Sequence, residues 1–212
     1  MRIGILGSGD VGRSLTLGFL GRGDEVMIGT RDPAKLQRWH EETAPSARIG
    51  RFEETARFGE AIALATLWSG TESALDLAGR DNLRGKVIID VTNPLVFPGE
   101  GPPELALGHS DSGGEQVQRW LMEAHVVKAF NTVGNGLFVK PDLAGGPPTM
   151  FYCGNDEEAK RFVRGVITDF GWEPFDVGGI EGARLLEPLC ILWVVYAMHV
   201  RSRRHAFKVL SG

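Results

Sequence analysis

Residues 1–12 of the chain read MRIGILGSGDVG. The apolar run IGIL passes directly into Gly7-Ser8-Gly9-Asp10-Val11-Gly12, which predicts a β-strand, a tight glycine turn and the start of a helix. Gly7 can adopt the turn's backbone angles, Gly9 has no Cβ and lets a pyrophosphate approach the main chain, and Gly12 lets the helix lie near the strand. Unpaired N–H groups and the positive end of the peptide dipoles suit a phosphate at the helix start. The stretch therefore predicts a dinucleotide-binding site; the alternative is a glycine turn in another kind of α/β domain.

Size and composition indicate one soluble domain with a small appendage. The 212 residues can bury a core, and the net charge of −4 comes from scattered charges, so no nucleic-acid partner is expected. Cys153 and Cys190 have no CxxC or histidine-rich partner, which argues against a metal site and favours reduced thiols in the cytoplasm. No charged segment precedes the first strand, so we expect no signal peptide. The most apolar stretch, Leu189–Met198, is shorter than the ~20 residues of a membrane span, so we expect no membrane partner but a buried or interface helix.

Strand and helix patterns alternate along the chain. Strands are expected at residues 3–6, 25–29, 47–50, 60–66, 86–90, 125–130, 149–153 and 172–175, with helices between most of them and a final helix at 183–200. Residues 92–114 lose this periodicity, cluster proline and glycine, and predict a long functional or mobile loop. The alternation predicts an α/β fold with a doubly wound parallel sheet of the Rossmann type. In that architecture ligands bind at the carboxyl ends of the strands.

The end of the second strand selects the cofactor. A domain that prefers NAD carries an acidic residue there, which accepts hydrogen bonds from the ribose 2′-OH. This chain has Thr30 and Arg31 instead, and an arginine offers a charged fork to a 2′-phosphate. Lys35 lies one helical turn further and could reach the same phosphate. We therefore predict NADP as the cofactor; the alternatives are that Arg31 and Lys35 form only a solvated helix start, or that Asp32 allows NAD to bind.

Three later strand-end loops are predicted to complete the cofactor site. Thr66-Leu67-Trp68 follows the fourth strand, and Trp68 either walls the cofactor or packs in the core. Asn93-Pro94 follows the fifth strand, where Asn93 either hydrogen-bonds a ribose or holds the turn. The sixth strand leads into Asn131-Thr132-Val133-Gly134-Asn135, which is expected to lie near the nicotinamide and to hold its carboxamide.

The chain shows no convincing general acid, general base or nucleophile, so we predict no catalytic residue. His109 and His125 have no carboxylate at a meaningful spacing, and no Gly-x-Ser-x-Gly elbow occurs. Hydride transfer between two stacked rings needs orientation and exclusion of water more than proton chemistry. The pattern therefore favours a reductase that passes hydride between two cofactors over an alcohol dehydrogenase.

Motifs along nearly the whole chain resemble the NADPH:coenzyme F420 oxidoreductases, which are deazaflavin-dependent NADP reductases, and their relatives called predicted dinucleotide-binding enzymes. They also resemble the cytosolic domain of the six-transmembrane epithelial ferric reductases. The resemblance rests on the glycine turn and on the segments IGTRDP at 28–33, DVTNP at 90–94, KAFNT at 128–132, YCGND at 152–156 and GARLLEPL at 182–189.

The resemblance implies that residues 8–12 hold the pyrophosphate and that Thr30, Arg31 and Lys35 bind the 2′-phosphate. Leu67 and Trp68 would flank the cofactor, and residues 133–135 would meet the nicotinamide where a deazaflavin or flavin ring stacks. It further implies an NADP-binding domain at residues 1–180 and a small C-terminal helical lobe at 181–212 that closes the cleft and forms a homodimer contact. An apolar Leu189–Met198 agrees with such a contact.

Two departures from that family lie on the side of the electron partner. The characterised reductases carry a proline where this chain has Gly134, and residues 97–112 are longer than in the archaeal enzymes. The identity of the acceptor and the direction of the reaction therefore stay open. Two alternatives to a flavin or deazaflavin reductase are an NADP-sensing module without catalysis and an imine or hydroxyacid reductase. The second usually needs a long helical domain that the ~30 residues after Gly182 cannot build in a monomer.

Overall fold

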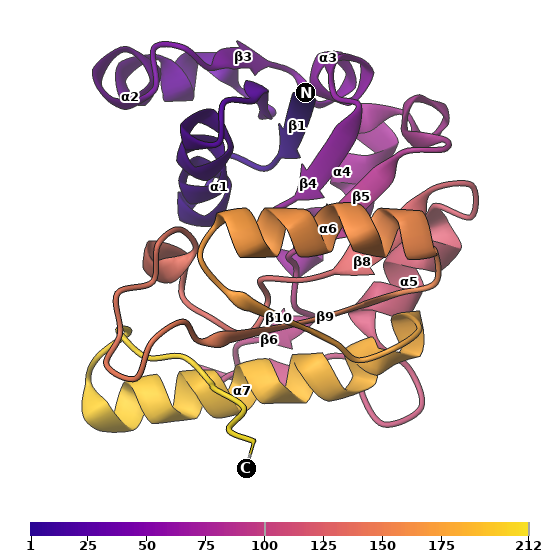
Figure 1. Cartoon of the computed structure of the whole chain (residues 1–212). Coiled ribbons are helices and arrows are strands. Elements are labelled where there is room, and N and C mark those ends of the chain that lie inside the picture. Colours follow the sequence, from indigo (N-terminus) through magenta and orange to yellow (C-terminus); the bar gives the residue numbers. More distant parts are fainter. Residues whose placement is uncertain (100, 212) are drawn as a thin grey trace.

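The computed structural model describes residues 1–99 and 101–211 and centres on an eight-stranded sheet (Figure 1). Its spatial order is β3-β2-β1-β4-β5-β8-β9-β10. The strands of this sheet are β1 (Arg2–Leu6), β2 (Glu25–Gly29), β3 (Arg48–Gly50), β4 (Ala61–Leu64), β5 (Val87–Asp90), β8 (His125–Lys128), β9 (Thr149–Gly154) and β10 (Glu173–Asp176). The six strands from β3 to β8 pair in parallel, with the order reversing beside β1, so the predicted Rossmann arrangement is confirmed.

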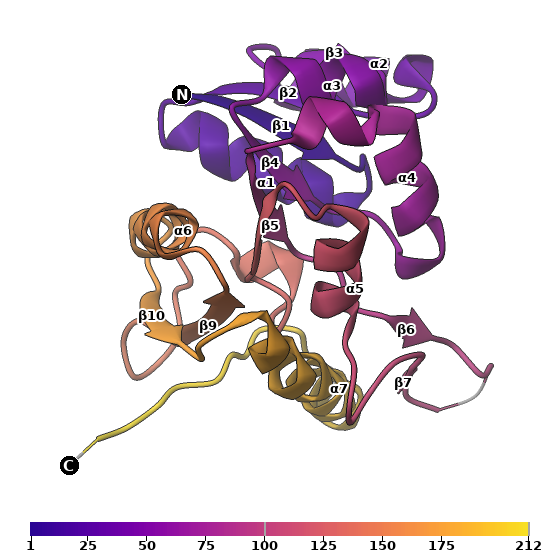
Figure 2. The ribbon, with the colours of Figure 1, turned by 90° about the vertical axis from the view of Figure 1, so that its right-hand side faces the viewer.

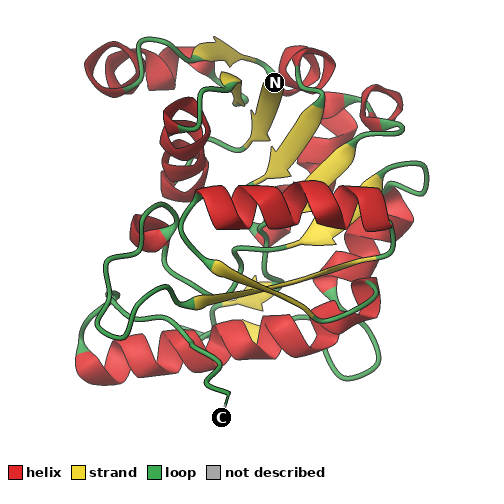
Figure 3. Cartoon of the chain, in the orientation of Figure 1, coloured by secondary structure: helices red, strands yellow, loops and turns green. Residues whose placement is uncertain are grey.

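Helices cover both faces of the sheet, as the view coloured by secondary structure shows (Figure 3). The α-helices are α1 (Asp10–Gly21), α2 (Gln37–Thr43), α3 (Phe52–Phe58), α4 (Thr71–Ala78), α5 (Gly113–Trp120), α6 (Glu157–Asp169) and α7 (Ala183–Val200). Short 3-10 helices are η1 (Pro33–Leu36), η2 (Trp68–Gly70), η3 (Arg80–Leu83), η4 (Asn135–Leu137) and η5 (Ile180–Gly182). The side-on view separates α6 from the group formed by α3, α4 and α5 (Figure 2).

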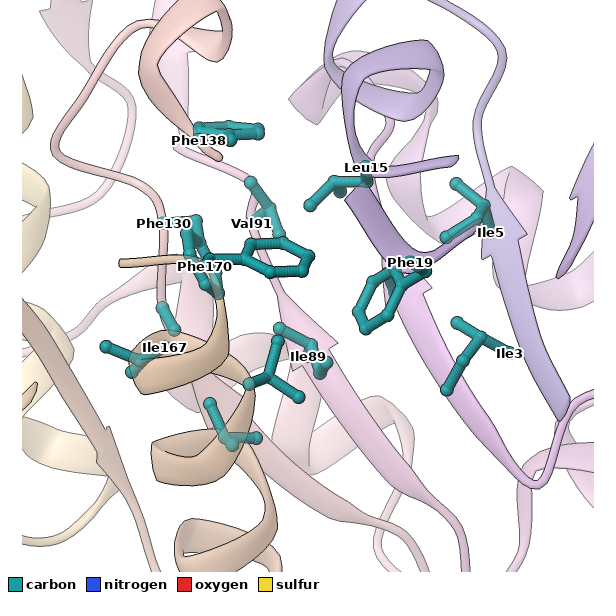
Figure 4. Close-up of a cluster of buried hydrophobic side chains, with 14 of the residues drawn as sticks. Ile3, Ile5, Leu15, Phe19, Ile89, Val91, Phe130, Phe138, Ile167 and Phe170 are labelled. Carbon is teal, nitrogen blue, oxygen red and sulfur yellow. The ribbon is translucent and has the colours of Figure 1, made fainter. Parts of the chain in front are cut away.

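Two hydrophobic clusters hold these layers together. One joins α1 and α6 to the sheet through side chains such as Phe19, Phe130 and Phe170 (Figure 4). The other joins α3, α4, α5 and the start of α7 to the opposite face. Strand β4, with the sequence AIAL, is buried at all four positions, because a central strand of a parallel sheet is covered on both sides. The core therefore fixes the carboxyl ends of β1, β4, β5 and β8 at one edge.

One pair of strands in this mostly parallel sheet runs antiparallel. β9 runs antiparallel to β8, with Lys128 opposite Cys153, and β10 then pairs in parallel with β9. Residues 129–148 contain only η4 and no crossover helix that would carry the chain back to the opposite edge. β9 therefore starts at the edge where β8 ends.

Two expectations need correction. The segment expected to be irregular contains a short antiparallel pair, β6 (Leu95–Val96) with β7 (Glu104–Leu105), and β7 packs near α7. The apolar C-terminal stretch is longer than expected, because Ile180–Val200 is 21 residues and is long and apolar enough to cross a membrane by length and composition alone. Glu187 lies within it and is buried against Lys128, so one face of this helix is bound to the rest of the protein.

Candidate functional site

The glycine turn after β1 leaves room for a ligand at one position only. Gly7 has a φ of 124°, and a Cβ placed there would lie 2.3 Å from the carbonyl oxygen of Ala65. A Cβ on Gly12 would lie 2.0 Å from the carbonyl oxygen of Gly7, so helix α1 lies directly against the turn. Gly9, the residue before α1, instead faces open space within 4 Å. The turn therefore presents an uncovered helix start, as a pyrophosphate requires.

The end of β2 lies beside this turn. The Ser8 hydroxyl donates to Thr30 Oγ1 at 3.1 Å, and the backbone N–H of Asp32 donates to the same oxygen at 3.3 Å. Arg31 is exposed and has no ion-pair partner among the residues that the structure describes. Lys35 is also exposed and lies 3.8 Å from Asp32 Oδ2. Two cations thus flank a buried threonine next to the glycine turn, as a 2′-phosphate site needs.

Arg13 belongs to this region although the sequence did not single it out. Its Nε donates to the carbonyl oxygen of Ser8 at 3.2 Å, and its guanidinium lies 5.4 Å from the ring centroid of Trp39. Arg13 therefore adds a third cation to the region formed by the glycine turn and the end of β2. Its position right after Gly12 was the signal that could have identified it, since residues in the first helical turn point toward the bound anion.

The loop after β4 forms the opposite side of the nucleotide edge. Thr66 Oγ1 lies 2.9 Å from Thr71 Oγ1, which also donates to the carbonyl of Leu67. Leu67 itself is exposed. The ring of Trp68 stacks on Trp120 of α5, with centroids 5.5 Å apart and planes at 25°. The core interpretation of Trp68 holds in part, because this half-buried ring packs against the second core cluster. Its role as a wall of the cofactor site stays a prediction.

Two asparagines join the loops after β5 and β8. Asn93 Nδ2 donates to the carbonyl of Asn131 at 2.9 Å, and Asn131 Nδ2 donates to Asn93 Oδ1 at 2.9 Å and to the carbonyl of Leu186 at 3.0 Å. Because the Leu186 carbonyl can only accept, the orientation of the Asn131 amide is determined. Its Oδ1 is then buried without a partner among the described residues. A buried acceptor of this kind suits the N–H of a carboxamide.

The preceding residue supports this arrangement. Phe130 has a φ of 59°, which is unusual for a bulky side chain, and its ring is buried against Phe138 and Phe170. The core packing of the ring holds the strained backbone turn that presents Asn131. The loop then continues through Val133, whose side chain lies in the first core cluster, so that only its backbone is available to a ligand. Pro94 is buried as well.

The last predicted residue, Asn135, bridges back to the glycine turn. Its Nδ2 donates to Ser14 Oγ of α1 at 2.9 Å. This hydrogen bond therefore connects the loop after β8, where the nicotinamide is expected, to helix α1, which begins where the pyrophosphate is expected. Ser14 was not predicted, and its place one turn into α1 becomes informative only once the strand order is known.

A buried charge cluster lies beneath the loops after β5 and β8. Lys128 Nζ is 2.9 Å from Asp90 Oδ2, 3.1 Å from Glu187 Oε1 and 2.7 Å from the carbonyl of Thr92, and the three charged side chains are 0–1% exposed. The carboxylate of Glu187 also accepts the backbone N–H groups of the first two residues of α5, at 2.9 and 3.0 Å. Burial alone would lower the pKa of Lys128, but the carboxylates of Asp90 and Glu187 raise it above its ordinary value, so Lys128 is charged.

Sequence reasoning missed this cluster. Its signal was the presence of Asp90, Lys128 and Glu187 in three largely apolar segments, VIID at 87–90, HVVK at 125–128 and the final helix. A charge in a buried strand or helix needs a partner, but the sequence does not say which one. Its three charged side chains are buried and bonded to one another and to backbone groups, which indicates a structural role beneath the site.

Other potential sites lie elsewhere or are closed. A shallow cavity of about 490 Å³ lies at the amino end of β8, lined by His125, Asp156 and neighbouring residues, away from the nucleotide edge. Within residues 1–99 and 101–211, no group of three or more His, Cys, Asp or Glu is placed to hold a metal. Burial raises the pKa of Cys153 to about 12 and of Cys190 to about 11, so both thiols stay protonated at neutral pH.

Taken together, the edge fits a dinucleotide with a 2′-phosphate. An open Gly9 lies at the pyrophosphate position, cations lie at the end of β2, and the Asn131 acceptor lies at the end of β8. Along the edge, the cations after β2, Gly9 after β1 and Asn131 after β8 lie in the order in which adenosine ribose, pyrophosphate and nicotinamide occur across a Rossmann sheet. Arg13 and Ser14, which were not predicted, also lie at this edge.

Comparison with known proteins identifies related sequences and structures. The family described as NADP oxidoreductase, coenzyme F420-dependent, matches residues 2–94. The F420-dependent NADP reductase of Methanocaldococcus jannaschii is 29% identical over 100% of this chain and 99% of its own. A crystal structure of a candidate F420-dependent NADP reductase from Arthrobacter sp. FB24 has a TM-score of 0.95 at 37% identity, with 100% of both chains covered. The metalloreductase STEAP3 of Rattus norvegicus is 31% identical over 89% of this chain, which spans only 36% of that protein's length.

Proposed function

Because the chain belongs to the family of coenzyme F420-dependent NADP oxidoreductases, we propose that it transfers a hydride between NADP(H) and a deazaflavin or flavin ring. NADP-dependent oxidoreductase chemistry is what this family shares. The identity of the second ring is the part that we add.

The end of β2 carries the proposal for the cofactor. Thr30 is buried and bonded to Ser8, while Arg31 and Lys35 stay exposed beside it. A guanidinium and an ammonium at this position stabilise a 2′-phosphate, whereas a carboxylate would select the free 2′-OH of NAD. The backbone at residues 8–12 and the Arg13 side chain complete the anion site. Thr66, Leu67 and Trp68 line the adjacent side of the edge.

The absence of an acid–base pair among the predicted site residues supports a ring-to-ring transfer. When bound, NADPH would supply a hydride, which is a proton with two electrons, to the second ring, and the further proton that this ring needs would come from water. The chain's own residues bind and orient the rings: Asn131 offers its buried acceptor, and Asn93 and Asn135 hold the two loops around it. Such positioning, rather than proton transfer by a side chain, lowers the barrier.

Turnover of purified protein with NADPH tests the proposal. Oxidation of NADPH is followed by absorbance with coenzyme F420 as acceptor and, separately, with free FMN. We expect turnover with at least one of them, and absence of turnover with either ring refutes the proposed reaction. NADPH binding without any turnover would instead support a redox-sensing module.

The Arg31→Ala variant tests the cofactor. Loss of a charge-assisted hydrogen bond costs about 1.5–3 kcal/mol, so NADPH should bind about 10–100-fold more weakly while NADH binding changes little. Arg38→Ala is the matched control, because Arg38 is also exposed but pairs with Glu42 on α2. Equal affinity of the unmodified protein for both coenzymes would contradict an NADP site.

We further propose that residues 181–212 form a lobe that closes the cleft over residues 1–180 and pairs two copies of the chain in the cytoplasm. The outer face of α7 carries a stripe of exposed apolar side chains, including Leu185 at 67%, Leu192 at 55% and Tyr196 at 51% exposure. An apolar stripe of this length favours burial against a second copy. The inner face of the same helix provides Leu186 and Glu187 to the site.

A further inference from the structure

Gly134 is a glycine because a tryptophan occupies the space next to it. A Cβ on Gly134 would lie 2.9 Å from Cη2 and 3.0 Å from Cζ2 of Trp193, closer than real Cβ contacts. The φ of Gly134 is −72°, which any residue can adopt. The need for glycine here is therefore one of space, imposed by the indole of α7, and not one of backbone conformation.

The C-terminal tail holds that indole in place. Trp193 Nε1 donates to the carbonyl of His205 at 2.9 Å, and His205 Nε2 lies 3.1 Å from the carbonyl of Trp193. The two rings stack with centroids 4.6 Å apart and planes at 16°. The tail is anchored in turn, because Thr149 N–H of β9 donates to the carbonyl of Phe207 at 2.9 Å. Trp193 is only 7% exposed, so its position is determined from several sides.

The other side of the loop is held by α1. Asn135 is bonded to Ser14, and Val133 is buried in the core. The segment 133–135 is thus enclosed between α1, which begins at the glycine turn, and Trp193. Its position relative to that turn depends on the indole.

We propose that Trp193 is a positioning residue for hydride transfer. Its indole contacts Gly134 and thereby sets the position of the loop at residues 133–135, where the nicotinamide is expected. His205 holds the indole in place. This inference rests on the proposed function. It extends that function to the C-terminal tail, whose Arg203 carbonyl oxygen would also lie 3.7 Å from a Cβ on Gly134.

The Gly134→Ala variant tests the inference, together with Trp193→Phe and the double variant. The added methyl group should displace the loop, and a misplacement of about 1 Å costs up to ~100-fold in rate. We expect kcat to fall about 10–100-fold, with KM for NADPH nearly unchanged, because the adenosine end binds elsewhere. Phenylalanine lacks the outer ring that the methyl group meets, so the double variant should regain most of the kcat that Gly134→Ala loses.

Gly136→Ala is the matched control. Gly136 lies in the same loop, and a Cβ there meets nothing within 4 Å, so its kcat should equal that of the unmodified protein. Melting temperatures of all variants are measured in parallel. A Gly134→Ala variant that melts earlier but keeps its kcat would show a merely structural contact, and purely additive losses in the double variant would also overturn the inference.

The emission of bound NADPH separates this inference from the proposed reaction. Nicotinamide fluorescence reports the ring's surroundings without an acceptor, so it applies even if no flavin or deazaflavin is reduced. We expect Gly134→Ala to alter this emission at saturating NADPH, and the double variant to restore it. Unaltered emission in Gly134→Ala would refute the positioning role, whereas lack of turnover in the unmodified protein would refute only the proposed reaction.

Discussion

Replacing Lys128 by methionine should strongly destabilise the protein. Lys128 is the cation shared by Asp90 and Glu187, at 2.9 and 3.1 Å, and none of the three is more than 1% exposed. Methionine keeps the volume but leaves two buried carboxylates without a counter-charge. Breaking a buried pair in this way costs about 3–5 kcal/mol, a large part of a total stability of about 5–15 kcal/mol.

Thermal unfolding measures this effect. For a chain of this size each kcal/mol corresponds to about 2–4 °C, so Lys128→Met should lower Tm by about 6–20 °C. Combining Lys128→Met with Asp90→Asn and Glu187→Gln should recover much of the lost stability, because neutral amides leave no unpaired charge in the core.

Lys160→Met is the matched control. Lys160 is also nearly buried, but its partners Glu157 and Asp176 are 78% and 38% exposed and stay hydrated without it. We expect this variant to lose at most about 1 kcal/mol. A Lys128→Met protein as stable as Lys160→Met would refute the argument that the buried cluster is electrostatically coupled.

Three further predictions concern other parts of the structure. Cys153 and Cys190 should resist alkylation at pH 7–8 in the folded protein and react fully in denaturant, because burial raises the pKa of both thiols; rapid labelling of the folded protein would contradict this burial. The hydrogen bond from Arg184 lowers the pKa of Glu115 below its ordinary 4.5, against the opposing effect of burial, so the carboxylate contributes stability above pH 4.5 that is lost as the pH falls through its folded pKa. The Glu115→Gln variant should therefore have a lower Tm at pH 7, and this difference should narrow as the pH falls below 4.5 when both proteins are followed by circular dichroism; a difference that does not change with pH would refute the assignment. Leu192→Glu should convert a dimer into monomers in sedimentation velocity, and a monomeric unmodified protein would disprove the dimer contact.

Much of the nucleotide half could be predicted because its determinants are local. The strand and glycine turn need only neighbouring residues to define them, and Thr30 and Arg31 follow their strand directly. The final helix, α7 at Ala183–Val200, agrees with its expected range of 183–200 to the residue. Expected and observed boundaries differ where local signals are weak, as at β4, which is shorter at both ends than expected.

For the part of the site expected to bind the nicotinamide, the sequence predicted which loops contribute but not how their side chains pack. Val133 was expected to meet the ligand, but its side chain packs in the core, and Trp68 turned out to stack on Trp120. β9 pairs antiparallel with β8 because residues 129–148 contain no crossover helix. The glycine-rich sequence of this connection does not reveal that. Each of these outcomes depends on which distant segment packs against the loop.

The sequence by itself determined the Rossmann-type alternation of strands and helices, the glycine turn and a cationic end of β2, because strand periodicity, turn chemistry and a charge after a strand all act over a few neighbouring residues. Only the tertiary structure decided that Lys128 lies between Asp90 and Glu187 and that Trp193 sets the place of Gly134. Those partners lie 38 to 59 residues apart along the chain. Only folding of the chain brings such residues into contact. Once they are buried, an unpaired charge is costly, and close packing leaves no room for an additional atom.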